Sequence, residues 1–358
     1  MFLKSLKLVN FRNYSSCNFE FKTPLIILLG NNAQGKSNFL ESIYFLSTTK
    51  SHKAEKDEEL IKKAENFLRV EGQVQNEENN DQTQLEIAMQ IVDGNLVKKV
   101  KVNGVTRRIV DYIGNLSVVT FSPEDINLVT GSPSLRRWHI DLTLAQIDKE
   151  YKKALTEYGE IIIRKNRLLK AIREGIAKIE ELNFWVNEQV RLGEIISTKR
   201  FKFFNFLNSV EKKFDSFFFE YLQNELSLKR ILEYQVREIA SATSLIGPHR
   251  DDFRFLTGKD KRDLAHFGSR GEHRTAILDL KLSEVSFVES TIGSRPILLL
   301  DDVFSELDDT HQEHVLGLVS LQQTIIASVE LDPHLKLKLK DASFFFVENG
   351  QLNEIVDK

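Results

Sequence analysis

The octet GNNAQGKS at Gly30–Ser37 restricts the possible folds more than any other stretch of the chain. It fits G-x-x-x-x-G-K-[ST], the pattern of a phosphate-binding loop, which needs a strand before it and a helix after it. Leu25–Leu29 is an unbroken apolar run typical of a strand buried on both faces, and Asn38–Phe45 has apolar residues at helical spacing. The sequence therefore predicts a strand, a glycine-rich turn and a helix within an α/β domain.

The residue types in this loop predict a site for a nucleoside triphosphate. Gly30 and Gly35 permit backbone angles that turn successive N–H groups toward a phosphate, and the helix N-terminus adds a positive dipole. We expect Lys36 to reach the β- and γ-phosphates of ATP and Ser37 to hold Mg²⁺. The expected nucleotide-binding residues are Gly30, Asn31, Asn32, Ala33, Gln34, Gly35, Lys36, Ser37 and Asn38.

The composition excludes several classes of protein. Lys+Arg 49 against Asp+Glu 52 gives a net charge of −3, so any contact with nucleic acid must come from local basic patches. A single cysteine, Cys17, excludes an intramolecular disulfide framework and fits a reducing compartment. The sequence shows neither the apolar region of a signal peptide nor the roughly 18–20 apolar residues of a membrane span. We therefore expect a cytoplasmic protein with no membrane partner.

Two patterns divide the chain. Period-two alternation predicts strands at Met1–Asn10, Phe67–Gln75 and Gln84–Val92, and we expect an antiparallel layer over roughly residues 66–120. From Leu142 to Glu238 apolar residues recur at intervals of three and four, which predicts helices. The alternatives for this segment are a coiled coil and a compact bundle, and the heptads do not persist, which favours the compact insert. Further strands, with a final hairpin, are expected at Pro296–Leu300, Thr324–Val329, Phe344–Glu348 and Gln351–Val356.

An apolar strand at Ile297–Leu300 ends in two carboxylates, Asp301 and Asp302. This is the form of a Walker B motif, in which Asp301 binds Mg²⁺ through water and Asp302 orients or deprotonates the attacking water. On its own the pattern is a weak signal, because an ordinary solvated acidic turn has the same sequence. Together with the phosphate-binding loop it predicts that Lys36, Asp301 and Asp302 carry the catalysis.

A second glycine-containing turn, Phe267–Thr275, stands before another predicted helix. Such a turn at a helix N-terminus is an anion-binding device. It cannot serve the nucleotide of Gly30–Ser37 if that nucleotide already has its own loop. The economical solution is an ATP-dependent homodimer in which this turn caps the γ-phosphate held by the other subunit. The residues expected to act in this way are Ser269, Arg270, Gly271 and Glu272.

Together these motifs resemble the ATP-binding-cassette ATPases of the SMC and RecF type. The resemblance rests on the phosphate-binding loop, the S-x-G-x-x-R turn at Ser269–Arg274, LLLDD and SELD. It implies a split ATPase head, with a P-loop core and an antiparallel β layer, interrupted by a helical domain. The implied division is 1–141, 142–238 and 239–358. Longer stretches similar to the bacterial RecF family are Phe11–Tyr14, Asn32–His52, Ser122–Arg137, Ile246–Phe253 and Leu298–Asp308.

The resemblance also implies a function. Proteins of the RecF family bind double-stranded DNA and single-strand/duplex junctions in an ATP-dependent way, and act with RecO and RecR to help load RecA at gaps. It implies a weak ATPase, with Arg12 near the nucleotide, Ser305 and Asp308 in the D-loop, and Ser328 at the switch position. Basic clusters are usually solvated faces, but they supply the candidate DNA contacts. These candidates are Lys62, Lys63, Lys98, Lys99, Arg107 and Arg108.

Some residues depart from the family pattern. Glu272 stands where a glutamine is expected, and a carboxylate facing a γ-phosphate is unfavourable unless it points away or pairs with His273 or Arg274. Ala327-Ser328 stands where relatives often carry two threonines. Asp302 replaces the glutamate of many cassette ATPases, and this shorter base predicts slow ATP turnover.

Other functions are compatible with parts of the pattern. A transporter ATPase subunit is disfavoured by the large helical insert and by the lack of a membrane segment. An SMC-type ATPase that serves a nuclease would need a long coiled coil or a further catalytic domain. A nucleotide-gated scaffold in another DNA-processing or defence complex, in which hydrolysis only resets the switch, stays compatible with every motif.

Overall fold

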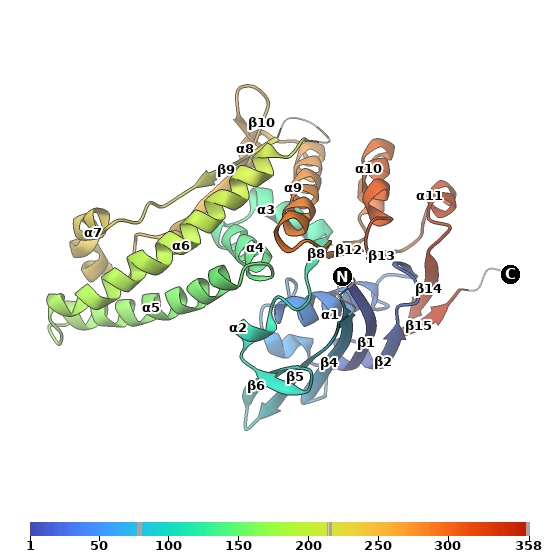
Figure 1. Cartoon of the computed structure of the whole chain (residues 1–358), viewed down its shortest axis with the longest axis horizontal. Helices are drawn as coiled ribbons and strands as arrows, with labels where there is room; N and C mark the ends of the chain where they lie inside the picture. The colour runs from blue at the N-terminus through green and yellow to red at the C-terminus, as the bar shows by residue number, and fades with distance from the viewer. Residues whose placement is uncertain (77–80, 213, 215–216, 356–358) are drawn as a thin grey trace. The chain divides into compact units, whose positions relative to one another are not determined.

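The computed structural model describes residues 1–76, 81–212, 214 and 217–355, and its elements are shown in Figure 1. The contacts between residues divide the chain into two units. The first, which we call the head unit, consists of Met1–Asp125 and Glu284–Lys358, and the second, the helical unit, is Ile126–Ser283. Each unit has its own sheet structure and its own apolar core.

A mainly parallel sheet forms the centre of the head unit. Its strands run in the order β15-β14-β3-β13-β12-β8, and only the edge strand β15 is antiparallel to its neighbour. The strand before the phosphate-binding loop, β3, thus pairs on both sides with strands from the far end of the chain. The bounds are β3 Leu25–Leu29, β8 Val118–Phe121, β12 Ile297–Asp301, β13 Thr324–Ser328, β14 Ser343–Glu348 and β15 Gln351–Glu354.

An antiparallel sheet forms a second layer of the head unit, with strand order β2-β1-β4-β5-β6-β7. The helix α1 (Lys36–Thr48) contacts strands of both sheets, and apolar residues all round the helix are buried, as expected for a helix between two layers. The strands are β1 Phe2–Phe11, β2 Tyr14–Glu20, β4 Phe67–Gln75, β5 Gln82–Val92, β6 Asn95–Val102 and β7 Val105–Arg107. Outer helices and turns are η1 Asp57–Leu60, α2 Ile109–Tyr112, η2 Pro123–Ile126, η5 Phe304–Glu306, α10 Asp309–Val319 and α11 Pro333–Lys338.

The predicted α/β fold, a split P-loop core with an antiparallel layer, is confirmed. Alternation placed β1, β4 and β5 correctly. The turns Asp93-Gly94 and Asn103-Gly104 join β5 to β6 and β6 to β7 as hairpins. The segment expected to be antiparallel, roughly residues 66–120, overlaps β8, yet β8 pairs in parallel with β12. The reason is that nearly every side chain of Val118–Phe121 is buried, whichever face of the sheet it points to. This pattern is typical of a strand in a parallel sheet that is covered on both faces.

The helical unit contains more than helices. Its longest elements are α5 (Lys149–Arg173) and α6 (Leu182–Ser209), which pack side by side (Figure 1). A small antiparallel sheet in the order β11-β10-β9 lies in the same unit. The remaining elements are α3 Asn127–Thr130, α4 Pro133–Ala145, η3 Ile179–Glu181, β9 Phe217–Leu222, α7 Leu228–Ser241, η4 Pro248–Arg250, β10 Asp252–Thr257, β11 Arg262–Asp263, α8 Leu264–Phe267 and the start of α9 Arg270–Ile292.

The boundaries of this unit differ from the predicted insert of 142–238. Two long-range interactions explain the larger extent. The strand β9 lies within the segment expected to be helical and pairs with β10, which was assigned to the ATPase head. Arg136, also assigned to the head, forms an ion pair with Asp252 at 2.6 Å. Interactions that join distant parts of the chain are not visible in local periodicity.

Buried ion pairs hold the helices of this unit together. Lys165 Nζ lies 2.7 Å from a carboxylate oxygen of Glu238, and both side chains are inaccessible to solvent. Arg200 contacts Asp141 at 2.7 Å and Asp251 at 2.8 Å. Because an unpaired buried charge is strongly destabilising, these residues are needed as pairs.

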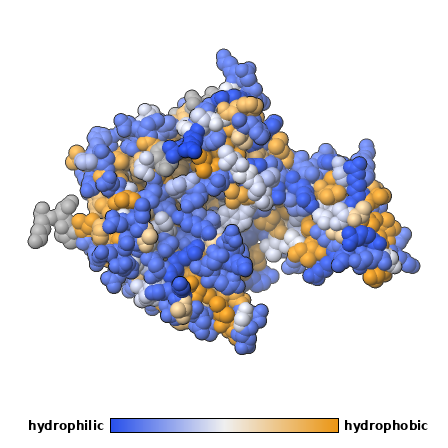
Figure 2. All heavy atoms as spheres, turned by 180° about the vertical axis from the view of Figure 1, so that it is seen from behind, coloured by the Kyte–Doolittle hydropathy of each residue, from blue (hydrophilic) through white to orange (hydrophobic). Residues whose placement is uncertain are grey.

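The outer surface is mixed in character. On the face shown in Figure 2, hydrophilic residues predominate and apolar residues form separate groups. Within the described ranges, no helix combines the length and the apolar character needed to cross a bilayer.

Candidate nucleotide-binding site

The phosphate-binding loop lies between β3 and α1, and its backbone requires glycine at two positions. Gly30 has a φ of 145° and Gly35 a φ of 117°, which are conformations that other residues rarely adopt. A Cβ at Gly30 would lie 2.4 Å from the carbonyl oxygen of Val347, and one at Gly35 would lie 2.6 Å from Asn13 Nδ2. The loop can therefore pack against its neighbours only without side chains at these two points.

The turn between β1 and β2 supports the loop from one side. Asn13 Nδ2 donates a hydrogen bond to the carbonyl oxygen of Gln34 at 2.9 Å, and Tyr14 donates to that of Gly35 at 2.9 Å. Asn13 Oδ1 in turn accepts from Asn38 Nδ2 at 2.8 Å. The stretch Phe11–Tyr14 therefore holds the loop in its conformation through Asn13 and Tyr14.

The turn of the final hairpin supports the same loop from another side. The backbone N–H of Gly350 donates to the carbonyl oxygen of Gln34 at 3.0 Å, and the N–H of Asn349 donates to Gln34 Oε1 at 2.8 Å. The sequence predicted this hairpin but not its contact with the phosphate-binding loop. Nothing in its local pattern connects it with residues 315 positions away.

Lys36 is already placed within the loop. Its side chain is 4% exposed, and Nζ donates to the carbonyl oxygens of Gly30 at 2.7 Å and Asn31 at 3.0 Å. Burial lowers the pKa of Lys36, and the carboxylates of Asp302 and Asp301 oppose that effect. The Lys36 ammonium is thus bound by carbonyl oxygens of its own loop. It lies next to the N-terminus of α1, where an anion is favoured.

The structure brings Ser37 and Asp301 together, although they lie 264 positions apart in the chain. Ser37 Oγ donates to Asp301 Oδ1 at 2.7 Å. Lys53 Nζ lies 2.7 Å from the other oxygen, Oδ2. Burial disfavours the charge on Lys53, but the hydrogen bond and attraction to Asp301, together with the charges of Glu124 and Glu41, outweigh it, so the pKa of Lys53 is raised.

Asp302 follows at the end of β12 in an uncommon backbone conformation. Its φ is 51°, and its N–H donates to the carbonyl oxygen of Ala327 at 2.9 Å. Burial and the neighbouring charge of Asp301 raise the pKa of Asp302, while Lys36 opposes the shift. A carboxylate with a raised affinity for protons suits the predicted role of general base.

Arg12 is held by a buried carboxylate. Its guanidinium forms a two-pronged ion pair with Glu41 of α1, at 2.9 and 2.7 Å, and donates to the carbonyl oxygen of Glu59 at 3.0 Å. Glu41 is fully buried and also accepts a hydrogen bond from Ser51. Arg12 therefore connects the first strand with α1, and its contact with a nucleotide stays a prediction.

The second turn that the sequence predicted to bind an anion lies in the helical unit. Ser269 Oγ accepts from the N–H of Glu272 at 3.2 Å, and Glu272 Oε2 accepts from the N–H of Ser269 at 2.7 Å. This reciprocal pair is a capping box at the start of α9. These hydrogen bonds and Arg262, which forms an ion pair with Glu272, lower the pKa of that carboxyl group.

The capping box corrects the expected environment of Glu272. The sequence offered His273 or Arg274 as its partner, but Glu272 pairs with Arg262. His273 instead contacts the carbonyl oxygen of Leu264 at 2.7 Å. Arg270 and Gly271 occupy the first turn of α9. The space beside the Gly271 Cα is open, since a Cβ there would have Ser269 Oγ as its neighbour, at 3.9 Å.

The predicted D-loop and switch residues each form a hydrogen bond with a backbone group close to them in the chain. Ser305 Oγ donates to the carbonyl oxygen of Asp302 at 2.8 Å. Asp308 caps α10 by accepting from the N–H of His311 at 2.9 Å. Ser328 Oγ donates to the carbonyl oxygen of Glu330 at 2.7 Å.

The predicted basic cluster on the β layer is not a single patch. Lys98 points inward and contacts Asp57 at 2.6 Å and the carbonyl oxygen of Thr49 at 2.8 Å. Lys99 points to the other face and is exposed, because successive side chains of a strand alternate. Lys98 is thus held within the head unit, and its contact with DNA stays a prediction. Of the other candidates, Arg108 pairs with Asp111 at 2.7 Å, Lys62 contacts Ser15, and Lys63 and Arg107 lie on the surface.

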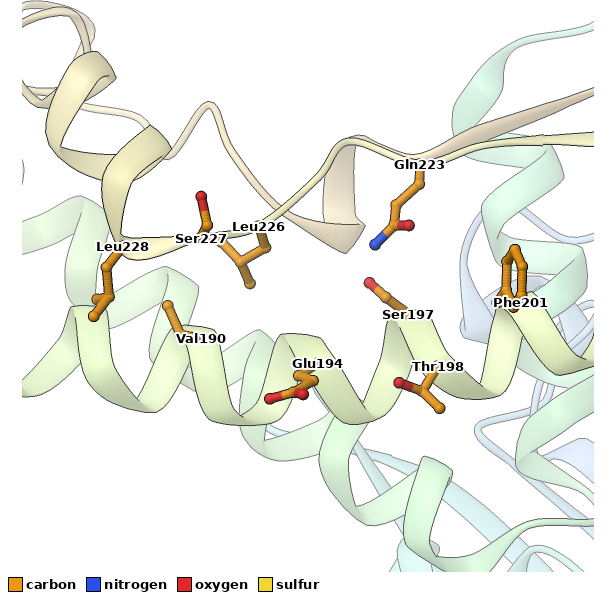
Figure 3. A pocket seen from close by; sticks show the side chains of 9 residues that line it. All are labelled: Val190, Glu194, Ser197, Thr198, Phe201, Gln223, Leu226, Ser227 and Leu228. Carbon is orange, nitrogen blue, oxygen red and sulfur yellow. The ribbon is translucent and has the colours of Figure 1, made fainter.

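A separate hollow of about 620 Å³ lies in the helical unit, between α6 and the segment leading into α7 (Figure 3). Its lining includes one charged residue, Glu194, and no basic residue, so it does not suit a phosphate. The residues that line it are Val190, Glu194, Ser197, Thr198, Phe201, Gln223, Leu226, Ser227 and Leu228.

The donor groups of the head unit fit ATP and Mg²⁺. A strand, a glycine-rich loop and a helix N-terminus supply N–H groups and a dipole for phosphate. Ser37 Oγ and the Asp301 carboxylate are hard oxygen ligands at hydrogen-bond distance from each other, which suits Mg²⁺. This combination of loop, helix and acidic strand end is that of a P-loop ATPase head.

Comparison with known proteins agrees with that class. A family model described as the RecF/RecN/SMC N terminal domain matches residues 2–337. The chain is similar to the DNA replication and repair protein RecF of Agathobacter rectalis, at 35% identity over 377 residues, which cover 100% of both chains. It is also 35% identical to that of Halalkalibacterium halodurans, over 99% of this chain and 100% of the relative.

Solved structures give the same result. The structure of the recombination mediator protein RecF-ATP in the RecFOR pathway matches with a TM-score of 0.89 and 30% identity, covering 99% of this chain and 98% of that one. The Smc head domain of Pyrococcus furiosus shares the fold, with a TM-score of 0.54 at 16% identity. The chain belongs to the RecF family, whose curated relatives are named for DNA replication and repair.

Proposed function

We propose that this chain is an ATP-dependent DNA-binding protein of recombinational repair and replication that closes as a dimeric clamp and reopens by slow ATP hydrolysis. The observation that carries this proposal is the contact of Ser37 Oγ with Asp301 at 2.7 Å beside the buried Lys36. Its similarity over almost the full length to RecF-ATP, a recombination mediator in the RecFOR pathway, supports it.

The residues of the head unit have separate roles in this proposal. Lys36 exchanges the carbonyl oxygens of Gly30 and Asn31 for the β- and γ-phosphates. Ser37 and Asp301 hold Mg²⁺, whose charge offsets that of the phosphates when it is bound. Asp302 accepts a proton from the attacking water, and its short side chain makes this step slow.

The clamp requires a second copy of the chain. Ser269 and Gly271 of one copy cover the γ-phosphate on the loop of the other, so that two nucleotides lie between two subunits. ATP drives closure only to the extent that it binds the closed dimer more tightly than the open monomer. Duplex DNA and single-strand/duplex junctions are the proposed ligands, with Lys62, Lys63, Lys99 and Arg107 as candidate contacts. RecR, with RecO, is the proposed partner in loading RecA.

Molar mass in solution tests this proposal directly. Light scattering would be recorded without nucleotide, with ADP and with ATP·Mg²⁺, each with and without a short DNA duplex. We expect a monomer that becomes a dimer only with ATP·Mg²⁺, and more completely with DNA. A constant molar mass under all these conditions would contradict the clamp.

Replacing Glu272 by glutamine is expected to strengthen ATP-driven dimerisation. Glutamine retains the reciprocal hydrogen bonds of the capping box but removes a negative charge from the turn that faces the γ-phosphate. We expect the dimer dissociation constant to fall about tenfold, which corresponds to about 1.4 kcal/mol. Sedimentation equilibrium with ATP·Mg²⁺ measures it.

The matched control is Glu289→Gln, which removes the same charge from the same helix α9, where Glu289 pairs with Arg295. It is expected to leave the dimer dissociation constant unchanged. If both variants change dimerisation equally, the effect comes from net charge rather than from the turn.

A further inference from the structure

We propose that Lys53 is a resident counter-ion of Asp301 that Mg²⁺ must displace, so that Lys53 sets the Mg²⁺ concentration at which this site takes up ATP. The inference rests on the proposed function of the site, since it concerns the arrival of Mg²⁺ there. It assigns a positioning role to a lysine that lies outside the phosphate-binding loop and outside the acidic strand end.

Lys53 completes the coordination of the Asp301 carboxylate. One carboxylate oxygen accepts from Ser37 Oγ at 2.7 Å, and the other lies 2.7 Å from Lys53 Nζ. The side chains of Lys53 and Asp301 are 22% and 8% exposed. Charges that are largely shielded from water interact more strongly than exposed ones, so this pair differs from an ordinary surface ion pair.

The backbone around Lys53 delivers its ammonium to this point. Ser51 Oγ accepts hydrogen bonds from the N–H groups of Lys53 and Ala54, both at 2.9 Å. Ser51 also donates to the fully buried Glu41, which holds Arg12. The turn that carries Lys53 is therefore anchored on α1 next to the nucleotide site, and the contact does not depend on a freely rotating surface side chain.

An ammonium group at this position competes with a divalent cation. A Walker B carboxylate acts on Mg²⁺ through the ion's water ligands, and Lys53 occupies the carboxylate oxygen that such a water would use. It also adds a positive charge that repels Mg²⁺. Glu124 and Glu41 both attract this ammonium, so carboxylates remain near it after it leaves Asp301.

A direct role in holding phosphate would give a different result. If Lys53 contacted the nucleotide, its removal would weaken ATP binding at every Mg²⁺ concentration. If Lys53 is a displaceable counter-ion, its removal lowers the Mg²⁺ concentration needed and leaves the affinity at saturating Mg²⁺ unchanged. The two roles therefore separate in a titration.

The test is the binding of a fluorescent ATP analogue to the full chain as a function of free Mg²⁺. For Lys53→Met we expect the Mg²⁺ midpoint to fall about tenfold, with unchanged affinity for the analogue at saturating Mg²⁺. Lys53→Arg keeps the charge, so its midpoint should stay near that of the wild type. Lys50→Met is the matched control, because Lys50 lies in the same segment but pairs weakly with Asp57 at 3.7 Å. Thermal unfolding verifies that each variant folds.

Two results would overturn this inference alone. An unchanged midpoint in Lys53→Met would show that the ammonium does not compete with Mg²⁺. A loss of affinity at saturating Mg²⁺ would make Lys53 a phosphate ligand instead. A wild-type chain whose nucleotide binding did not depend on Mg²⁺ would overturn both the inference and the proposed function, and this is visible without any variant.

Discussion

Replacing Lys36 by methionine is expected to abolish the binding of ATP·Mg²⁺ and, with it, ATP-dependent dimerisation. Lys36 is the cation within the phosphate-binding loop, and it is held by the carbonyl oxygens of Gly30 and Asn31. In the proposed function Lys36 exchanges these carbonyls for the β- and γ-phosphates. Each hydrogen bond to a charged group contributes about 1.5–3 kcal/mol, so losing the two bonds to phosphate weakens ATP binding by on the order of a hundredfold or more. Calorimetric titration with ATP·Mg²⁺ measures the affinity, and light scattering measures the dimer.

The fold is expected to survive this change. Methionine fills nearly the same space, and it removes a charge whose burial is unfavourable, as the lowered pKa of Lys36 indicates. Urea unfolding should therefore give a stability equal to or above that of the wild type. Lys63→Met, at an exposed lysine of the same unit, is the control and should bind ATP normally. If the Lys36→Met variant still formed dimers normally with ATP·Mg²⁺, the proposed mechanism would be incorrect.

Replacing Ser269 by arginine is expected to separate ATP binding from dimerisation. The loop, Lys36 and Asp301 belong to the head unit, whereas Ser269 caps the N-terminus of α9 in the helical unit. A bulky side chain there should prevent the turn from closing over the nucleotide of a second copy. We expect monomers that bind ATP·Mg²⁺ with wild-type affinity, as measured by calorimetry, and that do not form dimers in light scattering.

This substitution also removes a helix cap, which costs about 1 kcal/mol of stability. Ser290→Arg provides the control, because it adds the same side chain at an exposed position near the other end of α9. It should dimerise as the wild type does. If Ser269→Arg instead lost ATP binding as a monomer, the turn would serve its own nucleotide, and its assignment to the other subunit would be incorrect.

Local pattern was enough to predict the core of the site. The run Leu25–Leu29, the loop Gly30–Ser37 and the strand before Asp301 each have a periodicity or residue spacing that requires one structure. Because parallel strands bring their carboxyl ends to the same edge of a sheet, the contact between Ser37 and Asp301 follows from the two motifs together.

Other features depend on contacts that no local pattern records. The pairing of β9 with β10 decides the extent of the helical unit, and the position of β8 follows from its pairing with β12. The partner of Glu272 is Arg262, which is separated from it by a short helix, α8. Lys53 reaches Asp301 because Ser51 is fixed on Glu41. Each of these is a tertiary interaction between segments that have ordinary sequences.

The hydrogen bonds from Asn349 and Gly350 to Gln34 have a consequence for how the protein folds during its synthesis on the ribosome. The loop emerges early during translation, but Asn349, whose N–H donates to the Gln34 side chain, is made 315 residues later. The strands that flank β3 are also synthesised near the end. Until then the apolar strand β3 and the helix α1 have no complete sheet to cover them, and contacts of such long range form slowly. A nascent chain is therefore expected to expose these segments to chaperones, and to gain the ability to bind ATP only at the last stage of its synthesis.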